Sequence, residues 1–466
     1  MTQRRLSTNT LPAAAVDGLL RRLEAGADPH ALLIVRNGET VFEAEWAPYR
    51  RDQPALVYSV SKTFTSVAIG LLAAESRLTL DDSVGALLDR PNPHGITVRH
   101  LLTMNTGHSP EQIERELRFD VERLLTVAPQ SRPGTRFAYN SDATFALSCI
   151  VTALTGERLT DYLRPRLLDP LGIPDRWMKP LAGIEQGFSG FHLTVDDIAR
   201  LARLLAEGGM WEGEQLVPAD YVRELSEVWS DTADPAAPAG DQDDWARGYG
   251  YQVWRSRHGF RLDGAYGQFG LILPDEGIVI AYQGATLETA ETLAAFWEFI
   301  ERLDDPGAEG SDTVDTPQTL DAWDARTALT AAPDGAADAA GWALVDDGDR
   351  GWTLTRPAEQ TPAGDIAVGR GAWVTTVLAA DVAPPALQPP APLAGPAVTA
   401  GTVLPVAARG EALADGVVRV HLVNTTSPHR LLIERDARGA LTVRWHTVPL
   451  QGRALDTLLV PPGIVG

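Results

Sequence analysis

Lysine is almost absent from this chain. Of the 40 basic residues only Lys62 and Lys179 are lysines, so the remaining 38 are arginines. A desolvated lysine can give up its proton near neutral pH, whereas an arginine stays protonated in proteins. A lysine retained in such an arginine-biased chain is therefore a candidate for proton chemistry rather than for a generic positive charge.

Cysteine occurs once, as Cys149. A single cysteine excludes an internal disulfide and any metal site built from cysteines. Its neighbours in the sequence are apolar, so we expect a small buried side chain rather than a nucleophile. No histidine pair or carboxylate cluster has metal-ligand spacing, and we expect no metal and no other cofactor.

Long apolar runs are also missing. No stretch of about 7 to 15 apolar residues follows Met1 to Asn9, as a signal peptide requires, and none reaches the roughly 20 residues of a membrane span. We therefore expect a cytoplasmic protein. The net charge of −22 comes from acidic residues spread along the chain. It disfavours nucleic acid and anionic membranes as partners, and it is typical of a solubilising surface.

The chain is nevertheless composed like a folded protein with more than one domain. Its 466 residues exceed what a single hydrophobic core holds, and 44% of them are apolar. The segment that follows Leu303, residues 304–317, has almost no apolar content. We predict an α+β domain over residues 1–303, a polar linker over 304–318 and a C-terminal all-β domain over 319–466.

The patterns within the first domain predict an antiparallel sheet flanked by helices. Asn37-Gly38 is a strong hairpin signal between two strand-like runs within residues 31–46. Helical spacing and strand-like runs alternate elsewhere. The predicted helices are 13–25, 59–76, 98–104, 142–154, 159–168, 195–207 and 290–303, and the predicted strands are 249–255, 267–273 and 277–283.

The all-β prediction for the second domain depends on short strand-like runs broken by glycine, aspartate and asparagine. A proline-rich stretch, 383–396, is interpreted as a loop. The predicted strands are 342–345, 352–355, 417–423, 430–433 and 441–445.

Ser59 and Lys62 are three residues apart at the start of a predicted helix, so their side chains share one face. The positive end of the helix dipole favours a serine alkoxide, and a neutral lysine can take the hydroxyl proton. An S-x-x-K tetrad alone is a weak signal. A helix cap beside a solvated charge is the alternative interpretation of this motif taken by itself.

The segment Tyr58 to Leu72 resembles the first active-site motif of the serine β-lactamase and penicillin-binding-protein superfamily, specifically its class C and esterase-like (family VIII type) branch. The resemblance covers about residues 13–303 and implies a β-lactamase/transpeptidase-like fold with a covalent acyl-enzyme at Ser59. Four further segments resemble ordered motifs of the same branch, namely 96–107, 133–141, 187–205 and 263–274.

Tyr139-Asn140-Ser141 resembles the family's Tyr-x-Asn motif, which implies that Tyr139 carries protons beside the nucleophile. Ser141 replaces the usual asparagine at a substrate-binding position. An alternative alignment takes Ser141-Asp142-Ala143 as the S-D-N motif of class A enzymes, but Ala143 breaks that pattern. A tyrosine acts as a base only if nearby cations lower its pKa, and Lys62 is the candidate cation.

The family's K-T-G motif aligns with Leu262-Asp263-Gly264, where only the glycine is kept. Gly264 would allow the backbone to approach the substrate closely. The resemblance implies that the backbone N–H groups of Ser59 and Ala265 form the oxyanion hole. In β-lactamases the lysine and threonine hold the substrate carboxylate, whereas Asp263 would repel it, unless Arg257 or Arg261 replaces the missing lysine.

The sequence therefore predicts a serine hydrolase of the carboxylesterase or amidohydrolase type, acting on small esters or amides through Ser59, Lys62 and Tyr139. Asp263 and Gly264 join Ser141 as substrate-binding candidates. One alternative is a β-lactamase or D-amino-acid peptidase, and another is a non-catalytic penicillin-binding-like sensor. A third alternative, compatible with the non-catalytic sensor, is that the C-terminal all-β domain is a structural or partner-binding module, and the oligomeric state is left open.

Overall fold

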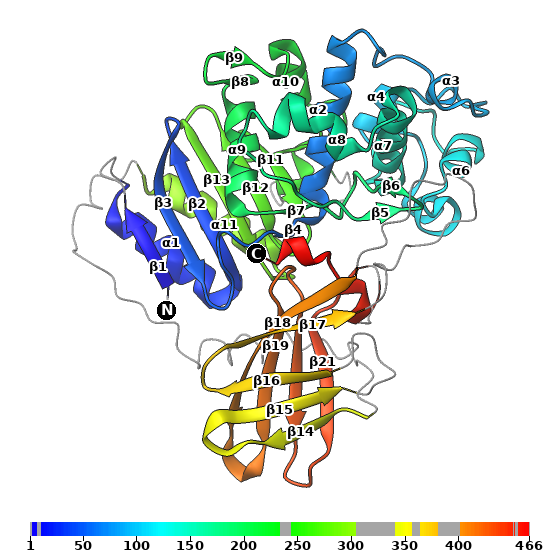
Figure 1. Ribbon diagram of the computed structural model, residues 1–466. Coiled ribbons are helices and arrows are strands. Elements are labelled where there is room, and N and C mark those ends of the chain that lie inside the picture. The colour runs from blue at the N-terminus through cyan, green and yellow to red at the C-terminus, as the bar shows by residue number, and fades with distance from the viewer. Residues whose placement is uncertain are drawn as a thin grey trace.

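The chain is described by a computed structural model that covers residues 2–6, 11–233, 244–303, 341–356, 364–380, 401–450, 452 and 455–465. Two large sheets organise these residues (Figure 1). The first lies in the N-terminal region and has helices on both faces. The second is an all-β region formed by the C-terminal part of the chain, and it lies directly below the first in Figure 1.

The N-terminal sheet is antiparallel and places the first hairpin beside strands from the end of the region. Its order is β1-β3-β2-β13-β12-β11-β10, with β2 and β13 paired at the centre. The strands are β1 (Thr2–Leu6), β2 (Pro29–Arg36), β3 (Glu39–Trp46), β10 (Trp254–Arg255), β11 (Phe260–Gly264), β12 (Gln268–Leu273) and β13 (Ile278–Gly284).

Alternate residues of the central strands enter two different cores, because successive side chains of a strand point to opposite faces. Leu32 lies in the core shared with α1 (Ala13–Gly26) and α11 (Thr289–Glu301). Leu33 lies in the core shared with α9 (Val195–Ala206). The sheet is thus buried on both faces and gives a rigid support for the loops at its edge.

A helical lobe formed by the chain between β3 and β10 covers the α9 face. Its central helix, α2 (Ser61–Ala74), is buried from Ser61 to Leu72 and packs against α7 (Ser141–Thr155). The other helices are α3 (Val84–Leu88), α4 (Val98–Leu102), α5 (Pro110–Gln112), α6 (Val121–Thr126), α8 (Leu159–Leu163) and α10 (Ala219–Ser226). Short strand pairs complete the lobe: β4 (Ala55–Leu56) with β7 (His192–Leu193), β5 (Pro180–Leu181) with β6 (Ile184–Glu185), and β8 (Met210–Trp211) with β9 (Glu214–Gln215).

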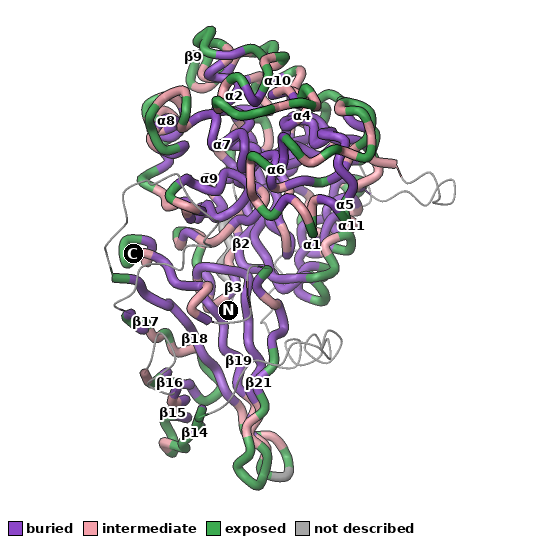
Figure 2. Tube along the Cα trace, turned by 90° about the vertical axis from the view of Figure 1, so that its right-hand side faces the viewer, coloured by how far each residue is buried: buried purple, intermediate pink, exposed green. Residues whose placement is uncertain are grey.

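The C-terminal sheet curls around its own core of aliphatic residues and tryptophans. Its order is β14-β15-β16-β18-β19-β20-β21, and β17 also pairs with β18. The strands are β14 (Ala343–Asp346), β15 (Gly351–Arg356), β16 (Gly364–Arg370), β17 (Val374–Ala380), β18 (Thr402–Ala412), β19 (Val418–Asn424), β20 (Arg430–Arg435) and β21 (Leu441–Thr447). In Figure 2 the strands β18 and β19 are purple over most of their length, and exposed residues gather at the hairpin tips far from the N-terminal region.

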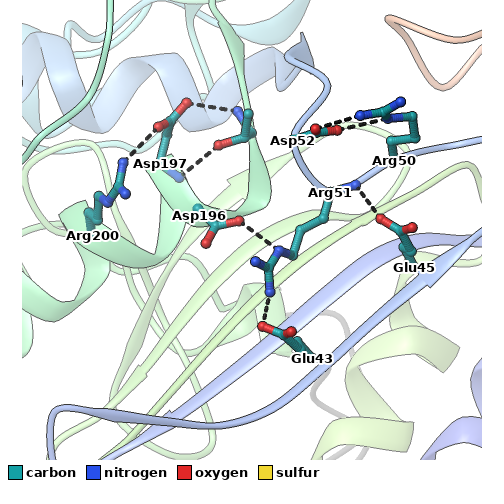
Figure 3. A network of polar contacts seen from close by, with 9 residues as sticks. Glu43, Glu45, Arg50, Arg51, Asp52, Asp196, Asp197 and Arg200 are labelled. Atoms are coloured by element: carbon teal, nitrogen blue, oxygen red, sulfur yellow. Dashed lines mark hydrogen bonds and ion pairs between the residues drawn. The ribbon is translucent and has the colours of Figure 1, made fainter. Parts of the chain in front are cut away.

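An arginine anchors the loop that leads from β3 to the start of α2 (Figure 3). The Arg51 guanidinium pairs with Glu43 of β3 and, at 3.2 Å, with Asp196 in the first turn of α9. The backbone N–H of Arg51 also donates to Glu45 at 2.9 Å. These contacts hold the loop against both the sheet and α9, and so they fix the position of the chain that leads into α2.

The predicted α+β class with a C-terminal all-β region is confirmed. Some predicted elements need correction, and others were missed. The run 249–255 is a strand only at β10, because Tyr249 to Val253 form turns and bridges instead. The strands β1, β11, β16, β17 and β18 of the two large sheets were not predicted, nor were the helices α3, α5, α6 and α10.

Strand β18 shows why a sequence pattern can hide a strand. It contains Pro405 and Gly410, both unfavourable in strands. Gly410 is required because a Cβ there would lie 2.9 Å from the Trp352 ring. The predicted linker 304–318 and the proline-rich stretch 383–396 lie outside the described residues, so the domain boundaries stay a prediction.

Among the described residues, no helix combines the length and the apolar character that crossing a membrane requires.

Candidate active site

Ser59 lies in a short 3-10 turn, η1 (Tyr58–Val60), that leads directly into α2. The preceding residue, Tyr58, has a left-handed backbone with φ of 47°. The N–H of Val57 donates to the carbonyl of Phe191 at 3.0 Å, which fixes the turn against the chain around β7. The predicted helix start at residue 59 is therefore two residues early, yet the half-buried serine still sits at the N-terminal end of α2.

Lys62, in the first turn of α2, is 1% exposed and reaches Ser59. Its Nζ lies 3.1 Å from Ser59 Oγ, 3.1 Å from Ser141 Oγ and 2.8 Å from the carbonyl oxygen of Phe188. All three partners are neutral oxygens. The contact predicted from the three-residue spacing of Ser59 and Lys62 is present in the structure.

Burial lowers the pKa of Lys62 to about 7, and the carboxylate of Asp142 opposes this shift. A neutral amine has two N–H groups and one lone pair. The Phe188 carbonyl can only accept, so it takes one N–H, and the Ser141 oxygen can take the other. The lone pair is then free to receive the hydroxyl proton of Ser59.

Tyr139 lies close to both Ser59 and Lys62. Lys62 Nζ is 5.0 Å from the centre of its ring, and the ring stacks on Trp254 at 5.7 Å. Burial and the charge of Asp263 raise the pKa of Tyr139, and hydrogen bonding to the Ser59 hydroxyl opposes the rise. The ring is 38% exposed, so solvent moderates this rise.

The expectation that Lys62 lowers the pKa of Tyr139 is therefore not met. The pKa of Lys62 is itself near neutrality, so Lys62 is a weak source of positive charge. Tyr139 stays protonated in the resting site and can donate, and Lys62 is the group that can accept.

Ser141 begins α7, where Asn140 caps the helix by accepting from the N–H of Ala143. The next residue, Asp142, was not among the predicted site residues. Its carboxylate accepts from the N–H of Phe119, and burial raises its pKa to about 6. Its position within the alternative Ser141-Asp142-Ala143 alignment was the only signal that could have drawn attention to it.

Gly264 is the last residue of β11, and its close contact differs from the predicted one. A Cβ at this position would lie 2.3 Å from the carbonyl oxygen of Val57. The missing side chain therefore lets the strand approach the loop before the nucleophile, whereas we predicted close approach to the substrate. Ala265 follows in the turn between β11 and β12, and its oxyanion role stays a prediction.

The charge of Asp263 is balanced by an ion pair that the sequence did not predict. Its carboxylate pairs at 2.8 Å with Arg261, whose side chain is wholly buried. Burial raises the pKa of Asp263, and the ion pair together with a hydrogen bond from Trp245 opposes the rise. The predicted repulsion of a substrate carboxylate is therefore weakened, because Arg261 balances the negative charge.

Neither arginine considered as a substitute for the lysine of K-T-G is placed to act as one. Arg261 uses its Nε and Nη1 atoms on Asp263 and on three oxygens of residues 244–256. Arg257 Nη1 lies 3.9 Å from Glu301 at the end of α11. The position of the family lysine is occupied by Leu262, which is fully buried.

The model of the Beta-lactamase family matches residues 16–304, well over half of the chain. Penicillin-binding protein 4 of Amycolatopsis lactamdurans is 24% identical over 324 residues, which cover 58% of this chain and 78% of that protein. Lovastatin esterase of Penicillium rubens is 25% identical over 220 residues, which cover 39% of this chain and about half (54%) of the esterase. A penicillin-binding protein homologue from Caulobacter crescentus shares the fold, with a TM-score of 0.50, 17% identity and coverage of 64% of this chain and 100% of that one.

The match of the family model spans the N-terminal sheet from β2 onward, the helical lobe and the contacts among Ser59, Lys62 and Tyr139. The chain therefore belongs to the β-lactamase family and is hydrolase-like.

Proposed function

We propose that this protein is a serine hydrolase that cleaves small esters or amides through a covalent acyl-enzyme at Ser59. The observation that carries the proposal is the placement of Lys62, a buried amine 3.1 Å from the Ser59 hydroxyl, held by two further oxygens. A pKa of about 7 leaves a large fraction of this amine neutral at physiological pH. A general base is most effective when its pKa lies near the working pH.

The reaction consists of two acyl transfers. Ser59 Oγ attacks the substrate carbonyl while its proton passes to Lys62 Nζ, and the N–H groups of Ser59 and Ala265 stabilise the oxyanion. The carbonyl bond to the leaving group then breaks. Tyr139 protonates the leaving oxygen or nitrogen and regains a proton from Lys62. Water attacks the acyl-enzyme by the reverse sequence and releases the acid.

Esters and uncharged amides fit this site better than substrates with a carboxylate at the third motif. Leu262 offers no positive charge there, and the Asp263 carboxylate is already paired with Arg261. The exposed part of Tyr139 and its stacking partner Trp254 add aromatic surface beside the nucleophile. The proposed substrates are therefore esters and amides that carry small neutral acyl groups.

Labelling with a fluorophosphonate, followed by mapping of the modified peptide, tests the nucleophile directly. We expect the label on Ser59 and sustained hydrolysis of p-nitrophenyl butyrate. Ser59→Ala should be unlabelled and lose on the order of 10⁵ or more in rate, since nucleophile and base act as a unit. Equal melting temperatures of the two proteins would show that folding is unaffected.

The possible outcomes separate the alternatives. Labelling without turnover would indicate a penicillin-binding-like sensor. Saturable hydrolysis of D-alanyl peptides or of nitrocefin in preference to the ester would indicate a peptidase or a β-lactamase. A label on another residue would contradict the mechanism.

A further inference from the structure

Two tyrosines flank the residues whose amides are proposed to form the oxyanion hole. Tyr58 precedes Ser59 and Tyr266 follows Ala265. Both tyrosines are buried, and both have a left-handed backbone, with φ of 47° and 66°. This conformation is strained for a residue with a bulky side chain, so the surrounding structure must hold it in place.

The hydroxyl groups of both tyrosines are bound by the C-terminal sheet region. The Tyr58 hydroxyl lies 2.6 Å from His429 Nε2, at the start of β20. The Tyr266 hydroxyl donates to the carbonyl of Val448, just after β21. The two rings are 5.3 Å apart, and His429 presents an edge to each of them. Residues far apart in the chain thus form one aromatic cluster next to the turns that carry the N–H groups of Ser59 and Ala265, here called the oxyanion turns.

The protonation of His429 is fixed by its other ring nitrogen. Nδ1 lies 3.0 Å from the carbonyl oxygen of Thr447, which can only accept, so Nδ1 carries the proton. Burial lowers the pKa of His429 to about 3, and the Thr447 carbonyl opposes that shift. The ring is therefore neutral, and Nε2 is an acceptor for the Tyr58 hydroxyl.

The backbone on each side of this cluster is also in contact. The N–H of Leu56 donates to the carbonyl of Thr426 in the C-terminal region at 2.9 Å. On the opposite side Gly264 packs against Val57, as described above. The loop before Ser59 is therefore held between β11 and the C-terminal segment 424–430.

We infer that the C-terminal sheet region completes the active site, with Tyr58 and Tyr266 as positioning residues for the two oxyanion amides and His429 as the anchor of Tyr58. The inference builds on the proposed function at Ser59. An oxyanion hole stabilises the transition state only when both donors lie about 2.7–3.1 Å from the developing charge. If the hydrogen bond from Tyr58 to His429 is lost, the oxyanion turns relax. The stabilisation of the transition state then weakens, whereas substrate binding changes little.

The test uses the full chain with Tyr58→Phe, Tyr266→Phe and His429→Ala. We expect kcat for p-nitrophenyl butyrate to fall about 10-fold in each phenylalanine variant and up to about 100-fold in His429→Ala, less than the roughly 10²–10³-fold loss for removal of an oxyanion donor. KM should stay within about threefold of wild type, as expected when only the transition state is affected. The double variant Tyr58→Phe/His429→Ala should be no slower than His429→Ala alone.

A second readout reports on the oxyanion hole itself. Phenylboronic acid forms a tetrahedral adduct with the serine, and its inhibition constant should rise by the factor by which kcat/KM falls. Tyr49→Phe is the matched control. Tyr49 is buried at the same junction against Ala407 and Val423, and its hydroxyl has no hydrogen-bond partner within the described residues. This variant should leave kcat and the inhibition constant within about twofold, because no bond to the oxyanion turns is lost.

The outcomes distinguish this inference from the function on which it rests. Unchanged kcat and inhibition constant in Tyr58→Phe and Tyr266→Phe, with wild type labelled on Ser59, would overturn the inference alone. A change confined to KM, or an equal loss in Tyr49→Phe, would also overturn it. Failure of the wild-type protein to be labelled on Ser59 would overturn the proposed function and the inference together. The phenylalanine variants preserve ring packing, so these comparisons remain possible if His429→Ala does not fold.

Discussion

The active site and the junction with the C-terminal sheet each bury a basic side chain, and they accommodate it in opposite ways. Lys62 faces three neutral oxygens. Arg430, equally buried, pairs at 2.9 Å with the buried carboxylate of Asp28. A buried lysine without a paired carboxylate can lose its proton, whereas a guanidinium cannot and needs a counter-charge. Burial therefore produces a base at one place and a structural ion pair at the other.

The second lysine shows the limit of the argument from lysine scarcity. Lys179 is also buried, and burial lowers its pKa. It lies at the junction, beside a cavity of about 30 Å³, and donates to the carbonyl of Thr457 at 3.2 Å. The scarcity of lysine therefore singles out two buried lysines. Of these two, Lys62 lies beside the proposed nucleophile, Ser59.

Among changes to the buried basic side chains, the largest expected effect on activity concerns the base. Lys62→Arg keeps a positive charge but cannot accept a proton, so kcat/KM should fall by about 10²–10⁴. Lys179→Arg is the matched control and should stay within a few-fold of wild type, because the cavity beside it offers room. Steady-state kinetics with p-nitrophenyl butyrate measure both. Normal turnover in Lys62→Arg would show that Lys62 acts only through its charge and would leave Tyr139 as the sole base.

Loss of the ion pair between Arg430 and Asp28 should have the largest effect on stability among the changes considered. Arg430→Met leaves the Asp28 carboxylate buried without its partner, which should cost about 3–5 kcal/mol in the free energy of unfolding. Adding Asp28→Asn should restore most of this loss, because the uncompensated charge is removed. Denaturant unfolding of the two single variants and the double variant measures the coupling. A single variant as stable as wild type would show that the pair is not needed.

Substrate preference gives a smaller effect. A β-lactam loses the charge-assisted hydrogen bond that the family's lysine provides to its carboxylate, worth about 1.5–3 kcal/mol, and the bond from the threonine hydroxyl in addition. With Asp263 balanced by Arg261, we expect little added repulsion. The ratio of kcat/KM for p-nitrophenyl butyrate over nitrocefin should therefore be about 10–10² or more in favour of the ester. The comparison uses one preparation with Ser59→Ala as the blank, and a better rate with nitrocefin would contradict it.

The smallest expected effect is a shift of the pH profile. Lys62 must be neutral to accept a proton, so kcat/KM should rise with pH through about 7 and then level off. The Asp142 carboxylate raises the pKa of Lys62, so Asp142→Asn should lower it and move the rising limb to lower pH by less than about one unit. Asp161→Asn, on the surface, should leave the limb in place. A shift to higher pH would exclude Lys62 as the titrating base.

Much of the fold and part of the site followed from local patterns. The hairpin at Asn37-Gly38, the amphipathic α9 and the Ser59–Lys62 spacing are short-range features, and each matches the structure. Asp142 and the pairing of Asp263 with Arg261 were missed because their effects depend on burial and on neighbours. The strand β18 was missed for a similar reason, since its glycine is explained only by the Trp352 ring packed on it.

The sequence by itself determined the nucleophile candidate, its lysine and the order of elements, because these depend on residue spacing along one helix and on periodicity within single strands. Only the tertiary structure decided the protonation states and the surroundings of the site. Desolvation of Lys62 arises from the packing of α2 against α7 and the Phe188 segment, which are far apart in the chain. The hydrogen bonds of Tyr58 and Tyr266 to the C-terminal region likewise exist only because folding brings together residues 371 and 182 positions apart in the chain.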